Sequence, residues 1–163
     1  MLTATLFTIL IISLITDIKY RRIYNVVTFP AMLIGLIGNT VTSGWDGLFF
    51  SLLGLLTGLG LLLIPYALGA MAAGDVKLLM AIGAIEGAAF TFGAFLYVAI
   101  IGGIIALGIL IWHKELLQSL KRIFLSAQFK TLNGLSKDEL HHAYPYGAAI
   151  VLGTLCFFGV GWL

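Results

Sequence analysis

The chain has 163 residues, of which 61% are hydrophobic and only 10% are charged. A soluble domain carries about 25% charged residues, so this composition excludes a water-soluble surface and predicts an integral membrane protein. The net charge of +2 is small and predicts no nucleic-acid partner, and one cysteine, Cys156, excludes an intrachain disulfide and a cysteine-based metal site.

Apolar runs predict an all-α, polytopic membrane protein with six transmembrane helices in one domain, residues 1–163. The first run has no basic region before it and no small-residue cleavage site after it, so a retained helix is expected and not a signal peptide. Cys156 lies inside the last run, and we expect it to be a buried small apolar residue. The predicted helices are Leu2–Tyr20, Val26–Thr42, Leu48–Leu68, Val76–Ile85, Ala88–Trp112 and Tyr146–Trp162.

The charges differ between the two sides of the predicted bundle. All nine Lys and Arg residues fall in the first, third and fifth connections, whereas the second and fourth hold only Asp46 and Glu86. The positive-inside rule therefore predicts an inner (cytoplasmic) membrane protein whose N-terminus lies outside. In the long connection 113–145, apolar residues with helical spacing predict an amphipathic helix in the inner interface, in contact with lipid.

Two aspartates are set against apolar runs on the predicted cytoplasmic side. Asp17 falls about one turn from the end of the first helix, and Asp75 precedes the fourth. A carboxylate near hydrocarbon is costly and by default marks a functional site. Two on one side suggest a pair that shares a proton, as aspartic proteases use to activate water.

Each aspartate also has a structural interpretation. Asp17 could pair with nearby basic residues at the surface, although the helix dipole disfavours a negative charge at a helix C-terminus. Asp75 could be the N-cap of the fourth helix. That helix is only about 15 Å long, so the Gly- and Ala-rich segment before it is predicted to be re-entrant, with both aspartates on the wall of a water-filled cavity.

Other residues near the aspartates have plausible supporting roles. Gly74 and Ala72 permit close backbone approach, and Lys77 suits an interfacial anchor, with a charge partner for a carboxylate as the alternative. Pro145 and Gly147 open the last helix, where a first-turn proline and tight packing explain them. His113, His141 and His142 lack metal-ligand spacing, so no metal or other cofactor is expected.

Three segments together resemble the type IV prepilin peptidases, membrane aspartic proteases that include archaeal preflagellin peptidases. TDIKYRRIYN is similar to the first aspartate motif, with Asp17 followed by Ile23-Tyr24-Asn25 in place of Ile-Pro-Asn. GAMAAGDVKLLMAIGA is similar to the Gly-x-Gly-Asp motif and its Val-Lys-Leu continuation, and PYGAAIVLG resembles the opening of the final helix. The resemblance implies that Asp17 and Asp75 are catalytic, with Asn25, Ala72, Gly74, Lys77, Pro145 and Gly147 in support.

The resemblance also implies a substrate and partners. The enzyme would remove the short basic leader of a prepilin or pilin-like precursor at the cytoplasmic boundary, alongside assembly components of a type IV pilus or secretion system. The five-residue gap between the second and third helices leaves no room for the methylating domain of larger relatives, which indicates the short, peptidase-only form that serves Flp-type pili.

Two other functions stay open at this point. Ala72 replaces the first glycine of Gly-x-Gly-Asp, which would suit an inactive relative that acts as an assembly scaffold. Intramembrane carboxylates also serve proton-coupled carriers. The absence of an internal inverted repeat and the placement of both aspartates near one face argue against a carrier.

Overall fold

The computed structural model describes residues 2–69, 71–112 and 146–161, and the described chain is entirely helical apart from short connections. The helices are α1 (Leu2–Tyr20), α2 (Asn25–Ala67), α3 (Ala73–Trp112) and α5 (Tyr146–Val160). The first three are long and apolar enough to cross a membrane, and α5 is a shorter apolar helix. The predicted all-α class is therefore confirmed, and the chain is a membrane protein.

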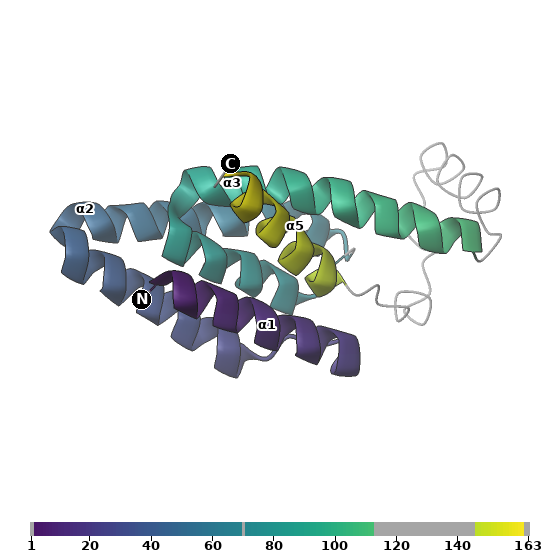
Figure 1. Cartoon of the computed structure of the whole chain (residues 1–163), viewed down its shortest axis with the longest axis horizontal. Helices are drawn as coiled ribbons and strands as arrows, with labels where there is room; N and C mark the ends of the chain where they lie inside the picture. The colour runs from purple at the N-terminus through teal and green to yellow at the C-terminus, as the bar shows by residue number, and fades with distance from the viewer. Residues whose placement is uncertain (1, 70, 113–145, 162–163) are drawn as a thin grey trace.

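Helices α2 and α3 each turn back on themselves at one glycine. Gly44 and Gly87 have positive φ angles of 63° and 82° inside otherwise helical segments, a conformation that glycine adopts without steric cost. Figure 1 shows both helices reversing direction at the same end of the bundle. These reversals fall in the predicted connections SGWDG and Glu86-Gly87, whereas the number of spans, six, stays a prediction.

The arms of α2 and α3 pack with backbone close to backbone. A Cβ on Gly35 would lie 2.7 Å from the Ala84 carbonyl oxygen, and one on Gly58 would lie 2.7 Å from that of Leu79. Gly54 and Gly83 face each other so closely that a Cβ on either would overlap the other's carbonyl. Small residues at helix contacts are how membrane helices gain dispersion energy when lipid is as apolar as their side chains.

The buried core lies around α3, where it packs against α1, α2 and α5. Large apolar side chains point outward elsewhere, as at Val26 and Val41, which are 82% and 79% exposed, and this is the pattern expected where lipid replaces water as the solvent. The largest fully buried apolar side chains are Leu6, Leu10, Leu62, Leu78, Leu79, Ile82, Val98, Ile150 and Val151.

Several sequence predictions are corrected or left untested by the structure. The predicted fourth helix begins at Ala73 and not at Val76, so Asp75 lies inside its first turn. Cys156 is exposed on α5 and not buried, because α5 is apolar on all sides and its buried residues end at Thr154. The re-entrant segment stays a prediction, and the amphipathic helix within 113–145 lies outside the described residues.

Candidate active site

Asp17 is buried in the last turn of α1, with 5% of its surface exposed. The backbone N–H of Ala148 donates a 2.9 Å hydrogen bond to its Oδ2 atom. Ala148 is in the first turn of α5, where N–H groups lack helical partners and the helix dipole is positive. The last helix therefore supplies the favourable partner that a carboxylate near the C-terminus of α1 lacks within its own helix.

Gly147 allows this contact. A Cβ at Gly147 would lie 2.7 Å from Oδ2 of Asp17 and 3.0 Å from Cδ1 of Ile23. Any side chain here would push α5 away from the carboxylate. Packing thus explains the glycine, as expected, but what it packs against is the carboxylate of Asp17.

Asp75 is buried at the start of α3 and is 6% exposed. The N–H of Ala72 donates to its Oδ2 at 3.1 Å, and the N–H of Asp75 donates in turn to the Ala72 carbonyl at 3.1 Å. Because Ala72 directly precedes the helix, it occupies the N-cap position and Asp75 the third helical position, as in a capping box. The N-cap interpretation of Asp75 is therefore wrong by three residues, although its carboxylate does satisfy a helix N-terminus.

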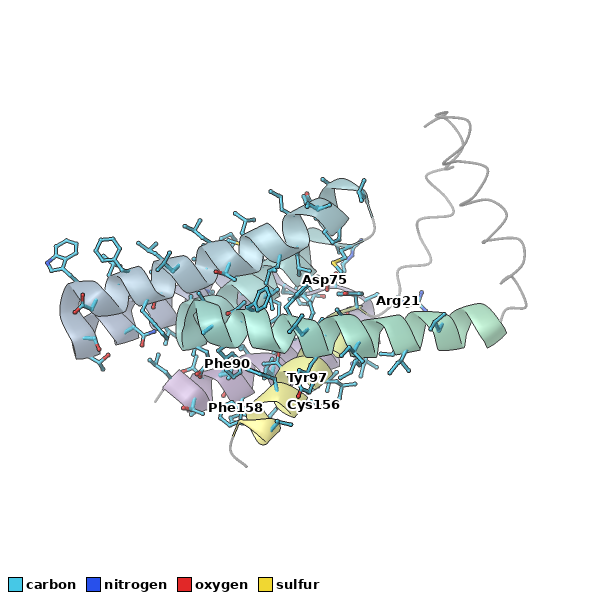
Figure 2. All side chains as sticks on the ribbon, turned by 90° about the horizontal axis from the view of Figure 1, so that it is seen from above. Arg21, Asp75, Phe90, Tyr97, Cys156 and Phe158 are labelled. Carbon is cyan, nitrogen blue, oxygen red and sulfur yellow. The ribbon has the colours of Figure 1, made fainter. Side chains whose placement is uncertain are left out.

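The fold brings the two aspartates, which are far apart in the sequence, to one end of the bundle. Gly147, which contacts Asp17, and Gly74, which precedes Asp75, both lie against Ile23. Figure 2 shows Asp75 toward the same end as Arg21, which follows α1, and away from Phe90 and Phe158. Each carboxylate thus accepts a backbone hydrogen bond at the N-terminus of a helix, at the same end of the bundle.

Residues 4–107 match the model of the type IV leader peptidase family. The chain belongs to this family. The matched segment includes Asp17 and Asp75 and ends before α5, so the contact between Asp17 and Ala148 lies partly outside it. Neither the search of curated proteins nor the search of solved structures found a match.

In this member of the family, Lys77 is bound to Asn25, and not to an aspartate of the described residues. Its Nζ donates a 2.8 Å hydrogen bond to Asn25 Oδ1 and lies 5.1 Å from the centre of the Phe29 ring. On a helix, positions two apart point to opposite sides, which is why Lys77 turns away from Asp75. The pair ties the beginning of α2 to the first turns of α3, so two predicted supporting residues meet each other.

Sequence reasoning missed Ile23 as a residue of this leader peptidase's candidate site. A Cβ on Gly74 would lie 3.0 Å from the Cβ of Ile23, and a Cβ on Gly147 would lie 3.0 Å from its Cδ1. Ile23 therefore fills the space between the N-termini of α3 and α5, beside Asp17. An apolar residue carries no chemical signal in a sequence, and the available indications were its place in the segment Ile23-Tyr24-Asn25 and the two glycines that it contacts.

Of the two remaining predicted supporting residues, the structure describes Ala72 but not Pro145. Ala72 has an exposed side chain, and its backbone N–H is what contacts Asp75. Replacement of a family glycine by alanine here therefore leaves the hydrogen bond to the carboxylate in place. Pro145 lies outside the described residues.

Proposed function

We propose that the chain is a membrane-embedded aspartic endopeptidase that removes the leader peptide of prepilin or pilin-like precursors. The observation that carries this proposal is the pair of buried carboxylates, Asp17 and Asp75, at one end of the bundle, each held by a backbone amide. Two carboxylates close together cannot both ionise easily, and a shared proton provides one acid and one base.

The chemistry follows from that division of roles. The ionised carboxylate removes a proton from water as the water oxygen attacks the scissile carbonyl, and the protonated carboxylate donates its proton to the carbonyl oxygen. The roles then exchange: the tetrahedral intermediate collapses, the C–N bond breaks and the leaving amine is protonated. The pair titrates as a unit, so neither proton is assigned to one aspartate. Amides of Ala72 and Ala148 would keep both carboxylates oriented throughout.

We propose a cytoplasm-facing site at a six-span bundle in the inner membrane. All the Lys and Arg residues of the described helix connections lie at the end that holds the aspartates, whereas the reversals at Gly44 and Gly87 lie at the other end. A basic leader reaches the site from the cytoplasm while the hydrophobic helix of the precursor stays in the bilayer. In a Cys156→Ala background, Trp45→Cys should react with an impermeant thiol reagent added outside intact cells, and Tyr24→Cys should not.

The proposed activity is tested by co-expressing a Flp-type prepilin with the wild type, Asp17→Asn and Asp75→Asn. We expect a faster-migrating product with the wild type alone, because either substitution removes the shared proton system. Asp46→Asn is the matched control, since Asp46 is exposed and lies beside the Gly44 reversal. Membrane accumulation of each variant must be equal, and cleavage by either site variant would rule out the proposal.

A separate variant addresses the scaffold alternative. If the wild type does not cleave but Ala72→Gly does, the chain is an inactive relative that one methyl group has impaired. Cleavage by the wild type at a rate similar to that of Ala72→Gly is the result expected here, because the Ala72 side chain is exposed and only its backbone touches Asp75.

A further inference from the structure

Ser13 has a buried hydroxyl that no other group of the described chain satisfies. The residue is 0% exposed, and its Oγ is a buried side-chain oxygen without a hydrogen-bond partner. Leaving a buried hydroxyl unsatisfied costs about 1–3 kcal/mol. An orphan of this kind in a native protein calls for a reason, such as a catalytic role or an ordered water.

Other hydroxyls in these helices avoid that cost within their own helix. Eight threonines donate to a backbone carbonyl three or four residues earlier, and Ser51 donates to the Gly35 carbonyl across α2. Ser13 has the Ile9 carbonyl at the equivalent position and does not bond to it. Its hydroxyl therefore differs from those of the threonines in having no backbone partner among the described residues. The threonines are Thr8, Thr16, Thr28, Thr40, Thr42, Thr57, Thr91 and Thr154.

On α1, Ser13 lies close to one of the two site aspartates. Ser13 and Asp17 are both on the buried face of α1, one turn apart, and residues four apart are neighbours with Cβ atoms about 5–6 Å from each other. Side chains on a helix lean toward its N-terminus, so the Asp17 carboxylate leans toward Ser13. A water that bonds to both fits this separation, and buried waters are bound by otherwise unsatisfied polar groups.

We infer that the Ser13 hydroxyl holds a water molecule that also bonds to the Asp17 carboxylate, which makes Ser13 a positioning residue for the candidate acid pair. This inference rests on the proposed function. The Ala148 amide fixes Asp17 from the side of α5, and the water held by Ser13 fixes it from deeper in the bundle. A carboxylate held at two points keeps its orientation while its proton is exchanged.

Ser13→Ala tests the inference through a split between kinetic constants. We expect kcat for precursor cleavage to fall about tenfold, KM to stay the same and the melting temperature to fall only slightly, because the variant removes one hydrogen bond to a bound water. Ser13→Thr, which keeps the hydroxyl, should retain most of the wild-type kcat. Thr8→Val is the matched control on α1, since the Thr8 hydroxyl is exposed and satisfied by the Ala4 carbonyl.

Each outcome decides the inference separately from the proposed function. Unchanged kcat in Ser13→Ala, with Asp17→Asn inactive, would overturn the role of Ser13 and leave the peptidase in place. A readout independent of activity is an experimental structure that resolves ordered water. A water within hydrogen-bond reach of both Ser13 Oγ and an Asp17 oxygen supports the inference, and a hydroxyl bonded to the Ile9 carbonyl with no such water overturns it.

Discussion

At the end of the bundle where α2 and α3 reverse, backbone lies against backbone, whereas at the opposite end buried acids lie against backbone amides. Near Gly87, the side-chain amide of Asn39 donates to Ser51 Oγ at 2.9 Å and to the carbonyls of Ala84 and Ile85 at 3.2 and 3.1 Å. These groups are neutral, and Asn39 connects the first arm of α2 to its second arm and to α3.

At the aspartate end, the polar groups and their hydrogen-bond partners are of a different kind. There two of the polar groups are acids: Asp17 is bound by the amide of the distant Ala148 and Asp75 by that of the nearby Ala72. The tie between Asn25 and Lys77 at this end is exposed. Neutral, tightly packed groups stabilise a fold, whereas buried acids tend to occur at functional sites and lower stability. The comparison indicates that stability is concentrated at the reversal end and chemistry at the other.

The largest expected effect is on stability at the reversal end. Gly54→Ala places a methyl group against the Gly83 carbonyl, where backbone cannot move aside, and should lower the free energy of unfolding by about 3 kcal/mol. Gly60→Ala is the control in the same arm of α2, because nothing lies within 4 Å of its Cβ position. Thermal unfolding in detergent measures both, and an equal effect at the two positions would contradict the close-contact argument.

The next effect separates activity from stability at the aspartate end. Gly147→Ala puts a methyl group 2.7 Å from Asp17 Oδ2, which displaces either the carboxylate or α5 and should reduce precursor cleavage about 100-fold. The melting temperature should change less than in Gly54→Ala, because a helix terminus moves more easily than a packed pair of helices. Gly159→Ala in α5, with nothing within 4 Å, should leave cleavage unchanged.

A smaller effect is expected at Asn39. Asn39→Leu leaves Ser51 and two carbonyls of α3 without their donor, and should cost about 2 kcal/mol of unfolding free energy. Cleavage per folded molecule should stay within about twofold, since the residue lies at the reversal end. A loss of specific activity larger than the loss of stability would break the proposed division between the two ends.

The smallest effect is expected at Lys77. Its bond to Asn25 is exposed, and exposed polar ties of this kind contribute less than about 1 kcal/mol. Lys77→Met should therefore lower the melting temperature only slightly, and less than Asn39→Leu does. Lys19→Met is the control, because Lys19 lies over the ring of its neighbour Tyr20 on the same helix. A large loss in Lys77→Met would show that the aspartate end also carries stability.

Much of the fold could be predicted because its signals are local. The first apolar run predicted α1 with its observed bounds. The breaks between later runs predicted the connections in which the chain reverses, at Gly44 and Gly87. The start of α3 was misplaced because Gly74 and Asp75 interrupt the apolar run, and Asp75 was interpreted as a possible N-cap. Cys156 was misplaced because a helix that is apolar on every side gives no sign of which face is buried.

The two acids of the candidate site could be predicted from the sequence, but the groups that contact them could not. The sequence shows two acids among apolar residues and predicts that both lie on one side of the bundle. The amide of Ala148 and the side chain of Ile23 could not be predicted, because a backbone N–H is the same in every residue but proline and an isoleucine carries no polar signal. Contacts across 131 positions of sequence, such as that of Ala148 with Asp17, depend on how the helices pack.

That contact has a consequence for synthesis. In a growing chain Asp17 and Asp75 are both added before Ala148, the residue whose amide holds Asp17. At about 5–20 residues per second, several seconds separate the addition of Asp75 from that of Ala148. The nascent protein therefore carries both acids before it can orient Asp17, and maturation of the site coincides with the addition of α5.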